Sequence, residues 1–133
     1  MRILVTGGAG FIGSHLVRGL IQSGHHSVVN LDALKYSGNL ENLADLAGHP
    51  QYTFVHADIG DRQAVHAALQ THRIEGIINC AAETHVDRSI LGPTEFVHTD
   101  VLGTMCLLEA ARETDARFVQ VSTDEVYGDL EAG

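Results

Sequence analysis

Short apolar segments alternate with longer amphipathic segments along most of the chain. Five short runs rich in β-branched residues are predicted to be strands: Arg2–Thr6, Ser27–Leu31, Thr53–His56, Gly76–Cys80 and Phe118–Val121. Nearly continuous apolar strands separated by helices are typical of a parallel sheet that is covered on both faces. The pattern therefore predicts an α/β fold.

The first connecting segment has the clearest helical period. Phe11–Ser23 places Ile12, Leu16 and Leu20 four residues apart on one face, and Gly24 supplies a stop signal. We therefore expect an amphipathic helix between the first two strands, with these three side chains on its apolar face.

The other connections are also predicted to be largely helical. Asp61–Thr71 begins with an Asp that can cap a helix. After Gly92-Pro93, a longer run through Arg112 keeps apolar side chains at helical spacing: Val97, Val101, Met105, Leu108 and Ala111. A loop with one short helix at Leu40–Leu46 is expected between the second and third strands. Right-handed crossovers then favour a Rossmann-type, doubly wound sheet of order 3-2-1-4-5.

Length and charge narrow the classes of function. A chain of 133 residues corresponds to one domain, and 44% apolar residues are enough for a packed core. The formal charge of −9 disfavours binding to nucleic acid, because an acidic field repels phosphates.

The cysteines and the apolar runs indicate the compartment. Cys80 and Cys106 lie inside apolar segments without a CxxC spacing, which suggests buried, reduced thiols. The sequence contains no apolar run long enough for a signal peptide or a membrane span. We therefore expect a soluble, cytoplasmic protein that does not bind a membrane.

A glycine-rich turn directly follows the first predicted strand. Gly7, Gly10 and Gly13 form a GxxGxxG pattern at the start of the predicted helix, whose free N–H groups can bind a pyrophosphate. Asp32, at the end of the second strand, can accept hydrogen bonds from ribose hydroxyls and would repel a 2′-phosphate. A P-loop is excluded because Gly13 rather than Lys precedes Ser14. The pattern predicts a dinucleotide site that prefers NAD to NADP.

Two residues after the third strand add to this site. Asp58 and Ile59 lie at the strand's carboxyl end, where open α/β sheets bind ligands. Asp58 could accept a hydrogen bond from an adenine amino group. Alternatively, Asp58 or Asp61 only caps the next helix, and the sequence leaves both interpretations open.

The chain resembles the extended short-chain dehydrogenase/reductase family through Thr6–Gly13, Asp32 and Asp58-Ile59. Two further stretches, Ala81–Ile90 and Ser122–Gly128, are similar to one branch of that family, the nucleotide-sugar 4,6-dehydratases, and most of all to those acting on dTDP-glucose. The resemblance implies NAD as the cofactor and a dTDP-sugar as the substrate.

The resemblance also implies which residues form the site. Those expected to contact the cofactor are Gly7, Gly10, Phe11, Ile12, Gly13, Asp32, Lys35, Asp58, Ile59, Ala81 and Ala82. His85, Arg88 and Ser89 would border the sugar and its diphosphate, although Arg88 could equally form a surface ion pair. Glu83, His85 and Asp87 alternate along one segment, but without a fourth ligand they do not predict a metal site.

Two adjacent carboxylates follow the fifth predicted strand. Asp124 and Glu125 could divide acid and base roles if their surroundings separate their pKa values. The resemblance implies that Glu125 removes the C5 proton, Asp124 protonates the departing C6 hydroxyl and Thr123 holds the C4 oxygen. The alternative is that Asp124 caps a following turn and Glu125 is solvated.

The family's Tyr-x-x-x-Lys couple does not occur in this sequence. Lys35 is the only lysine, and none of the three tyrosines has a lysine four residues later. We therefore expect the chain to be an NAD-binding Rossmann domain truncated after strand five, without its nucleotide-sugar domain and inactive alone. An NAD-dependent nucleotide-sugar epimerase or decarboxylase, or a non-catalytic NAD-binding module, remains the alternative.

Two other features bear on the resemblance. Asp100 stands where the family usually has Asn, which puts the geometry near the nicotinamide in question. Gly92–Arg112 resembles one of the two helices through which the family dimerises, so a homodimer is expected of the full-length parent rather than of this fragment.

Overall fold

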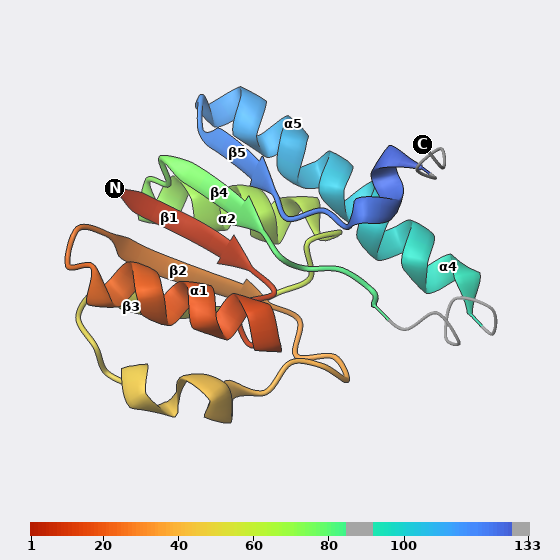
Figure 1. Cartoon of the computed structure of the whole chain (residues 1–133). Helices are drawn as coiled ribbons and strands as arrows, with labels where there is room; N and C mark the ends of the chain where they lie inside the picture. Colours follow the sequence, from red (N-terminus) through yellow and green to blue (C-terminus); the bar gives the residue numbers. More distant parts are fainter. Residues whose placement is uncertain (85–91, 129–133) are drawn as a thin grey trace, which may run out of the picture.

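Five parallel strands form one sheet at the centre of the molecule (Figure 1). The computed structural model describes residues 1–84 and 92–128, with only the backbone at 124 and 125. The strand order is β3-β2-β1-β4-β5, which confirms the doubly wound order predicted from the sequence. The strands are β1 (Arg2–Thr6), β2 (Ser27–Asp32), β3 (Tyr52–His56), β4 (Gly76–Asn79) and β5 (Arg117–Gln120).

The first strand has the predicted bounds, and the other four differ from their predicted bounds by one residue at one or both ends. β5 begins at Arg117, which pairs with Gly76, and ends at Gln120 rather than Val121. The amide of Val121 nevertheless donates to the Asn79 carbonyl at 3.0 Å. The strand therefore frays gradually, and a hydrophobic pattern does not locate the last paired residue.

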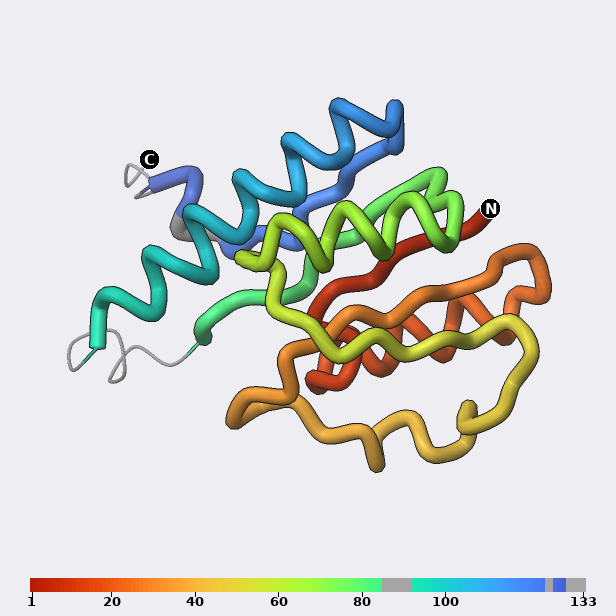
Figure 2. Tube along the Cα trace, turned by 180° about the vertical axis from the view of Figure 1, so that it is seen from behind, coloured from red at the N-terminus to blue at the C-terminus, as the bar shows by residue number. Residues whose placement is uncertain are grey.

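Helices cover both faces of the sheet (Figure 2). On one face, α1 (Phe11–Gln22) and the 3₁₀ helix η1 (Leu40–Leu46) pack over apolar residues of β1 and β2. On the other face, α2 (Arg62–His72) and α5 (Thr104–Thr114) enclose a second core around Leu4, Leu31 and Ile77. Strands buried on both faces explain the nearly continuous apolar runs in the sequence.

The buried face of α1 differs from the predicted one. Val17 and Ile21 are buried, whereas Ile12 is 63% exposed. Leu16 and Leu20 are only partly buried at the margin of the core. The predicted apolar face was therefore wrong by about one position: Val17 and Ile21 face the core, while Ile12, at the start of the helix, lines a cavity.

The predicted long helix is continuous but changes its winding. It runs through α4 (Pro93–Phe96), the π-helix η2 (Val97–Gly103) and α5. Gly103 packs closely against Ile59, which follows β3: a Cβ on Gly103 would lie 2.6 Å from the Ile59 Cδ1 atom. The apolar residues Val97, Val101, Met105 and Leu108 form a stripe that is 48–60% exposed. Within the described residues, no helix is both long and apolar enough to span a bilayer.

Candidate functional site

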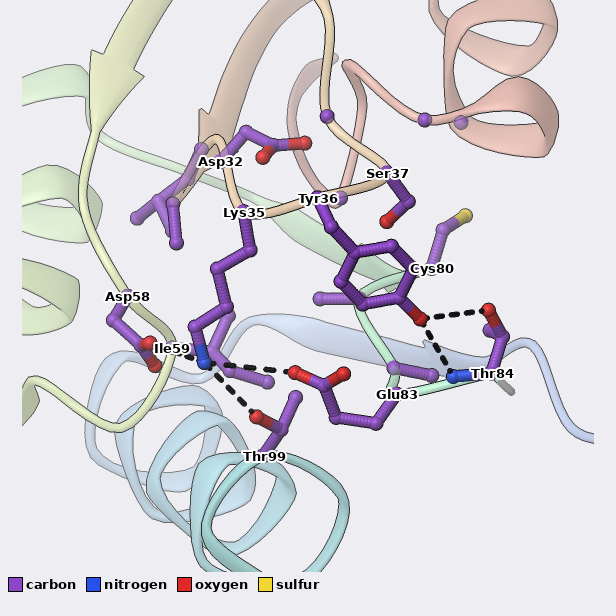
Figure 3. A pocket seen from close by; sticks show the side chains of 18 of the residues that line it. Asp32, Lys35, Tyr36, Ser37, Asp58, Ile59, Cys80, Glu83, Thr84 and Thr99 are labelled. Carbon is purple, nitrogen blue, oxygen red and sulfur yellow. Dashed lines mark hydrogen bonds and ion pairs between the residues drawn. The ribbon is translucent and has the colours of Figure 1, made fainter. Parts of the chain in front are cut away.

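A cavity of about 340 Å³ opens at the carboxyl ends of the strands. It lies where the chain crosses from one face of the sheet to the other, the point at which doubly wound folds bind ligands. All eleven residues that the sequence predicts to bind a cofactor line this cavity. Figure 3 labels four of them, Asp32, Lys35, Asp58 and Ile59. The structure thus brings together side chains and backbone from four separate connections.

The glycine turn forms the wall of the cavity at the start of α1. Gly7 has a φ of 66°, and a Cβ there would lie 2.7 Å from the Ala81 amide nitrogen. A Cβ on Gly13 would lie 2.7 Å from the Gly8 Cα atom. Gly10 precedes α1, and no side chain caps the helix. The first turn of α1 therefore presents amide N–H groups at a surface that only glycines permit.

Asp32 is held by backbone groups on both sides. Its side chain is buried, with the residue only 8% exposed. One carboxylate oxygen accepts from the Ala9 amide at 2.9 Å and the other from the Leu34 amide at 2.8 Å. Each oxygen keeps a second lone pair for a ligand, so the carboxylate is oriented before anything binds.

Ala9 is fixed at its carbonyl as well as at its amide. The carbonyl accepts from the Asn39 amide at 3.0 Å and from the Asn42 side chain at 2.9 Å. Arg18 reinforces this contact, because it binds the Asn42 carbonyl at 2.7 Å and both carboxylate oxygens of Asp45 at 2.8 Å. The connection between β2 and β3 thus holds the glycine turn in a fixed position.

Asp61, not Asp58, caps the next helix. The Asp61 carboxylate accepts from the Ala64 amide at 3.0 Å at the start of α2. Asp58 instead accepts from the Gly60 amide at 2.8 Å and pairs with Lys35 Nζ at 3.2 Å. Burial would raise the pKa of Asp58, but these two contacts outweigh it and lower the pKa. The carboxylate is therefore ionised at the cavity wall.

Lys35 extends across the cavity from the loop after β2. Its Nζ lies 3.3 Å from Thr99 Oγ1, 3.6 Å from a Glu83 oxygen and 3.8 Å from a Glu95 oxygen. Burial would lower the pKa of Lys35, but the hydrogen bond and charge of Asp58, with the two glutamates, raise it overall. The cation therefore stays protonated among carboxylates.

A buried amide supports the backbone beside the glycine turn. Asn79, at the end of β4, is fully buried and accepts from the Thr6 hydroxyl and from the Ala81 amide. Its amino group donates to Gln120 at 2.9 Å. This network connects β1, β4 and β5 directly under the Ala81-Ala82 wall.

Sequence reasoning missed several lining residues, among them Tyr36, Cys80, Glu83, Thr84 and Thr99. The side chain of Glu83 lines the cavity and is only 8% exposed. The sequence pattern had placed it only among three alternating residues considered as a metal site. Among the described residues, no cluster of His, Cys, Asp or Glu could hold a metal.

The expectation of buried thiols was wrong, because both cysteines are only partly buried. Both are free. Burial nevertheless raises the pKa of Cys80, which keeps that thiol protonated. The hydrophobic neighbours in the sequence did not reveal that Cys80 borders a cavity.

Asp100 has a contact close to the cavity. Its carboxylate accepts from the Glu83 amide at 2.9 Å, from its position in η2. This accepting role needs only an oxygen, which the side chain of Asn also provides. The negative charge at this position is therefore compatible with the observed backbone.

The predicted catalytic residues follow β5 but are not in the described lining of the cavity. Thr123 is exposed, and the 3₁₀ helix η3 (Asp124–Tyr127) starts directly after it. His85, Arg88 and Ser89 lie outside the described residues. The structure thus brings together the eleven residues predicted to bind a cofactor, and their roles, like those of the other six, stay predictions.

Residues 4–133 match the GDP-mannose 4,6 dehydratase family. The chain belongs to this family. It is 51% identical to the dTDP-glucose 4,6-dehydratase of Shigella flexneri over 140 residues, which cover 98% of the chain. The chain spans 39% of the length of that relative.

Solved structures of similar proteins have the same fold. The dTDP-glucose 4,6-dehydratase of Streptomyces venezuelae, crystallised with NAD bound, matches with a TM-score of 0.91 and 47% identity. The UDP-glucose 4-epimerase of Thermotoga maritima matches with a TM-score of 0.87 and 35% identity. They cover 100% and 99% of this chain, which spans 42% and 41% of theirs.

Proposed function

We propose that this chain is the NAD-binding part of a dTDP-glucose 4,6-dehydratase. The observation that supports it most is the single cavity in which the glycine turn, Asp32, Asp58-Ile59 and Ala81-Ala82 meet. The identity to dTDP-glucose 4,6-dehydratases, at 51%, exceeds the 35% to a UDP-glucose 4-epimerase. That difference favours the dehydratase over an epimerase that shares the same cofactor fold.

The cavity fits NAD in its chemistry. The uncapped start of α1 and the glycine surface at Gly7 and Gly13 suit a pyrophosphate. Asp32 offers oriented oxygens to ribose hydroxyls and disfavours a 2′-phosphate. When bound, NAD supplies reversible hydride acceptance.

The catalytic step is assigned to the segment after β5. Glu125 takes the C5 proton of the sugar, and Asp124 gives a proton to the C6 hydroxyl that leaves as water. Thr123 donates a hydrogen bond to the C4 oxygen. His85, Arg88 and Ser89 contact the nucleotide sugar. Support for this arrangement comes from the position of η3 at the carboxyl end of β5, the edge of the sheet where the cavity opens.

Dimerisation of the longer protein is assigned to the stripe of Val97, Val101, Met105 and Leu108. These side chains follow one helical face and are half exposed, as an unpartnered apolar interface would be. A cytoplasmic location is part of the same proposal, since the free cysteines suit a reducing compartment.

Two measurements test the proposal. The first is calorimetric titration of the 133-residue chain with NAD, which we expect to bind, and with NADP, which we expect to bind much more weakly. The second uses a chimera in which these residues replace the matched first part of the Shigella flexneri enzyme. We expect the chimera, but not the chain alone, to convert dTDP-glucose to the 4-keto-6-deoxy sugar.

A matched pair of variants tests the catalytic assignment in the chimera. Glu125→Gln removes the base but keeps the shape, so we expect turnover to fall by about 10²–10⁴-fold. Glu113→Gln on α5 makes the same chemical change at a remote site and should leave turnover unchanged. Full activity of Glu125→Gln would exclude Glu125 as the base, and C4 epimerisation without elimination would favour an epimerase.

A further inference from the structure

Two consecutive residues of one loop pair with two consecutive residues on the opposite side of the cavity. Lys35 Nζ lies 3.6 Å from a Glu83 oxygen, and the Tyr36 hydroxyl accepts from the Thr84 amide at 3.3 Å. The hydroxyls of Tyr36 and Thr84 are also 3.2 Å apart. Figure 3 shows the side chains of Lys35 and Tyr36 reaching from the β2–η1 loop to the segment after β4. We name these four residues the clasp.

The clasp is anchored to two further elements. Lys35 also contacts Asp58 after β3, at 3.2 Å, and Thr99 in η2, at 3.3 Å. Glu83 is itself fixed, because its amide donates to Asp100 at 2.9 Å and its side chain is only 8% exposed. The contacts therefore join the loop to the segments after β3 and β4 and to η2.

Carboxylates surround the ammonium of Lys35. It lies within hydrogen-bond distance of Asp58, at 3.2 Å, and of the Thr99 hydroxyl, at 3.3 Å. The carboxylates of Glu83 and Glu95 lie at the longer ion-pair distances of 3.6 and 3.8 Å. These three negative charges offset the charge of Lys35, so Lys35 is poorly suited to act as a direct phosphate ligand, although it lines the cavity.

We propose that Lys35 and Tyr36 are positioning residues that close the clasp over the dinucleotide site, so that cofactor release requires the clasp to open. The proposal rests on the NAD binding proposed above. It assigns to Lys35 a role exerted through Glu83 and Asp58 rather than on the cofactor itself.

The test is the rate at which NADH leaves the 133-residue chain, followed by its fluorescence after excess NAD is added. Lys35→Met and Tyr36→Phe should each accelerate release by about two- to fivefold, the effect of one partly exposed polar contact. Raising the salt concentration from about 0.1 to 1 M should accelerate release from the wild type but not from Lys35→Met. Salt screens the ion pairs of Lys35, which this variant lacks, and leaves the hydrogen bonds of Tyr36 in place.

Matched controls isolate the clasp. Arg62→Met removes a cation that pairs with Glu109 and Glu113 away from the cavity, and Gln63→Leu removes an exposed polar side chain from the same helix. Both should release NADH at the wild-type rate. Unchanged release in Lys35→Met and Tyr36→Phe overturns the clasp, whereas a wild-type chain that binds no NADH overturns the proposed function instead.

Glu83→Gln distinguishes the clasp from direct contact with the cofactor. If Lys35 acts through Glu83, this variant accelerates release, and combining it with Lys35→Met adds little. If Lys35 binds the cofactor, Glu83→Gln frees the ammonium and slows release, which refutes the proposal. Glu83→Gln and Tyr36→Phe also carry the test if Lys35→Met does not fold.

Discussion

A methyl group added at Gly13 should disable the dinucleotide site with little effect on the rest of the fold. The new Cβ of Gly13→Ala would meet the Gly7 carbonyl oxygen and lie 2.7 Å from the Gly8 Cα and 2.9 Å from the Gly7 carbonyl carbon. Every one of these atoms belongs to the backbone, so no side chain can move aside. Relief requires the turn and the helix to separate by about 1 Å, a strain of about 1–3 kcal/mol.

We expect that separation to reduce NAD affinity by about tenfold to a hundredfold, since the amides that face the ligand move with the turn. Calorimetric titration measures the affinity, and urea denaturation measures the remaining stability. Gly19→Ala is the matched control, because it lies in the same helix with nothing within 4 Å of its Cβ. It should bind NAD normally and gain about 0.5–1 kcal/mol of stability. Wild-type affinity in a folded Gly13→Ala protein would refute the assignment of this turn.

Three further predictions concern the buried network, the ionised wall and the apolar stripe. Asn79→Ala should lower the free energy of unfolding in urea by about 2–4 kcal/mol, because it leaves the buried Thr6 hydroxyl and the Ala81 amide without their acceptor, whereas Gln63→Ala at an exposed position should change it little. The contacts of Asp58 with the Gly60 amide and Lys35 lower its pKa in the folded protein, so its contribution to stability is present above the unfolded pKa and is lost as the pH falls through the folded pKa; Asp58→Asn should therefore flatten the acid limb of a stability–pH curve. Met105→Glu in the active chimera should shift sedimentation from dimer to monomer, while Gln63→Glu should not; a persistent dimer would exclude the stripe as the interface.

The residues that meet in the cavity were largely predictable because their determinants are local. The glycine turn, the first strand and Asp32 lie within one βαβ unit, and Gly7, Gly10, Gly13 and Asp32 line the observed cavity. Alternating strands and helices likewise determined the sheet order, since right-handed crossovers leave few arrangements.

What the sequence did not reveal depends on contacts between distant segments. Gly8 was not singled out, yet a Cβ there would lie 2.6 Å from Cγ of the buried Asn30, 22 residues away. The π-helical winding of η2 fits the close packing of Gly103 on Ile59, which helical periodicity cannot indicate. The partners of Lys35 come from the two connections that follow β3 and β4, so its place in the sequence gave no sign of them.

The clamp on Ala9 has a consequence for how this domain becomes able to bind a ligand. Ala9 lies in the glycine turn directly after β1. Its amide donates to Asp32, and its carbonyl accepts from Asn39 and Asn42, so residues far along the chain hold the turn. A nascent chain that has formed only β1 and α1 therefore lacks a rigid turn until the next strand and η1 have docked. The domain can therefore bind a dinucleotide only once the βαβ unit and η1 have assembled. A bound dinucleotide should in turn protect the η1 amides from hydrogen exchange, although η1 supplies none of the residues that line the cavity.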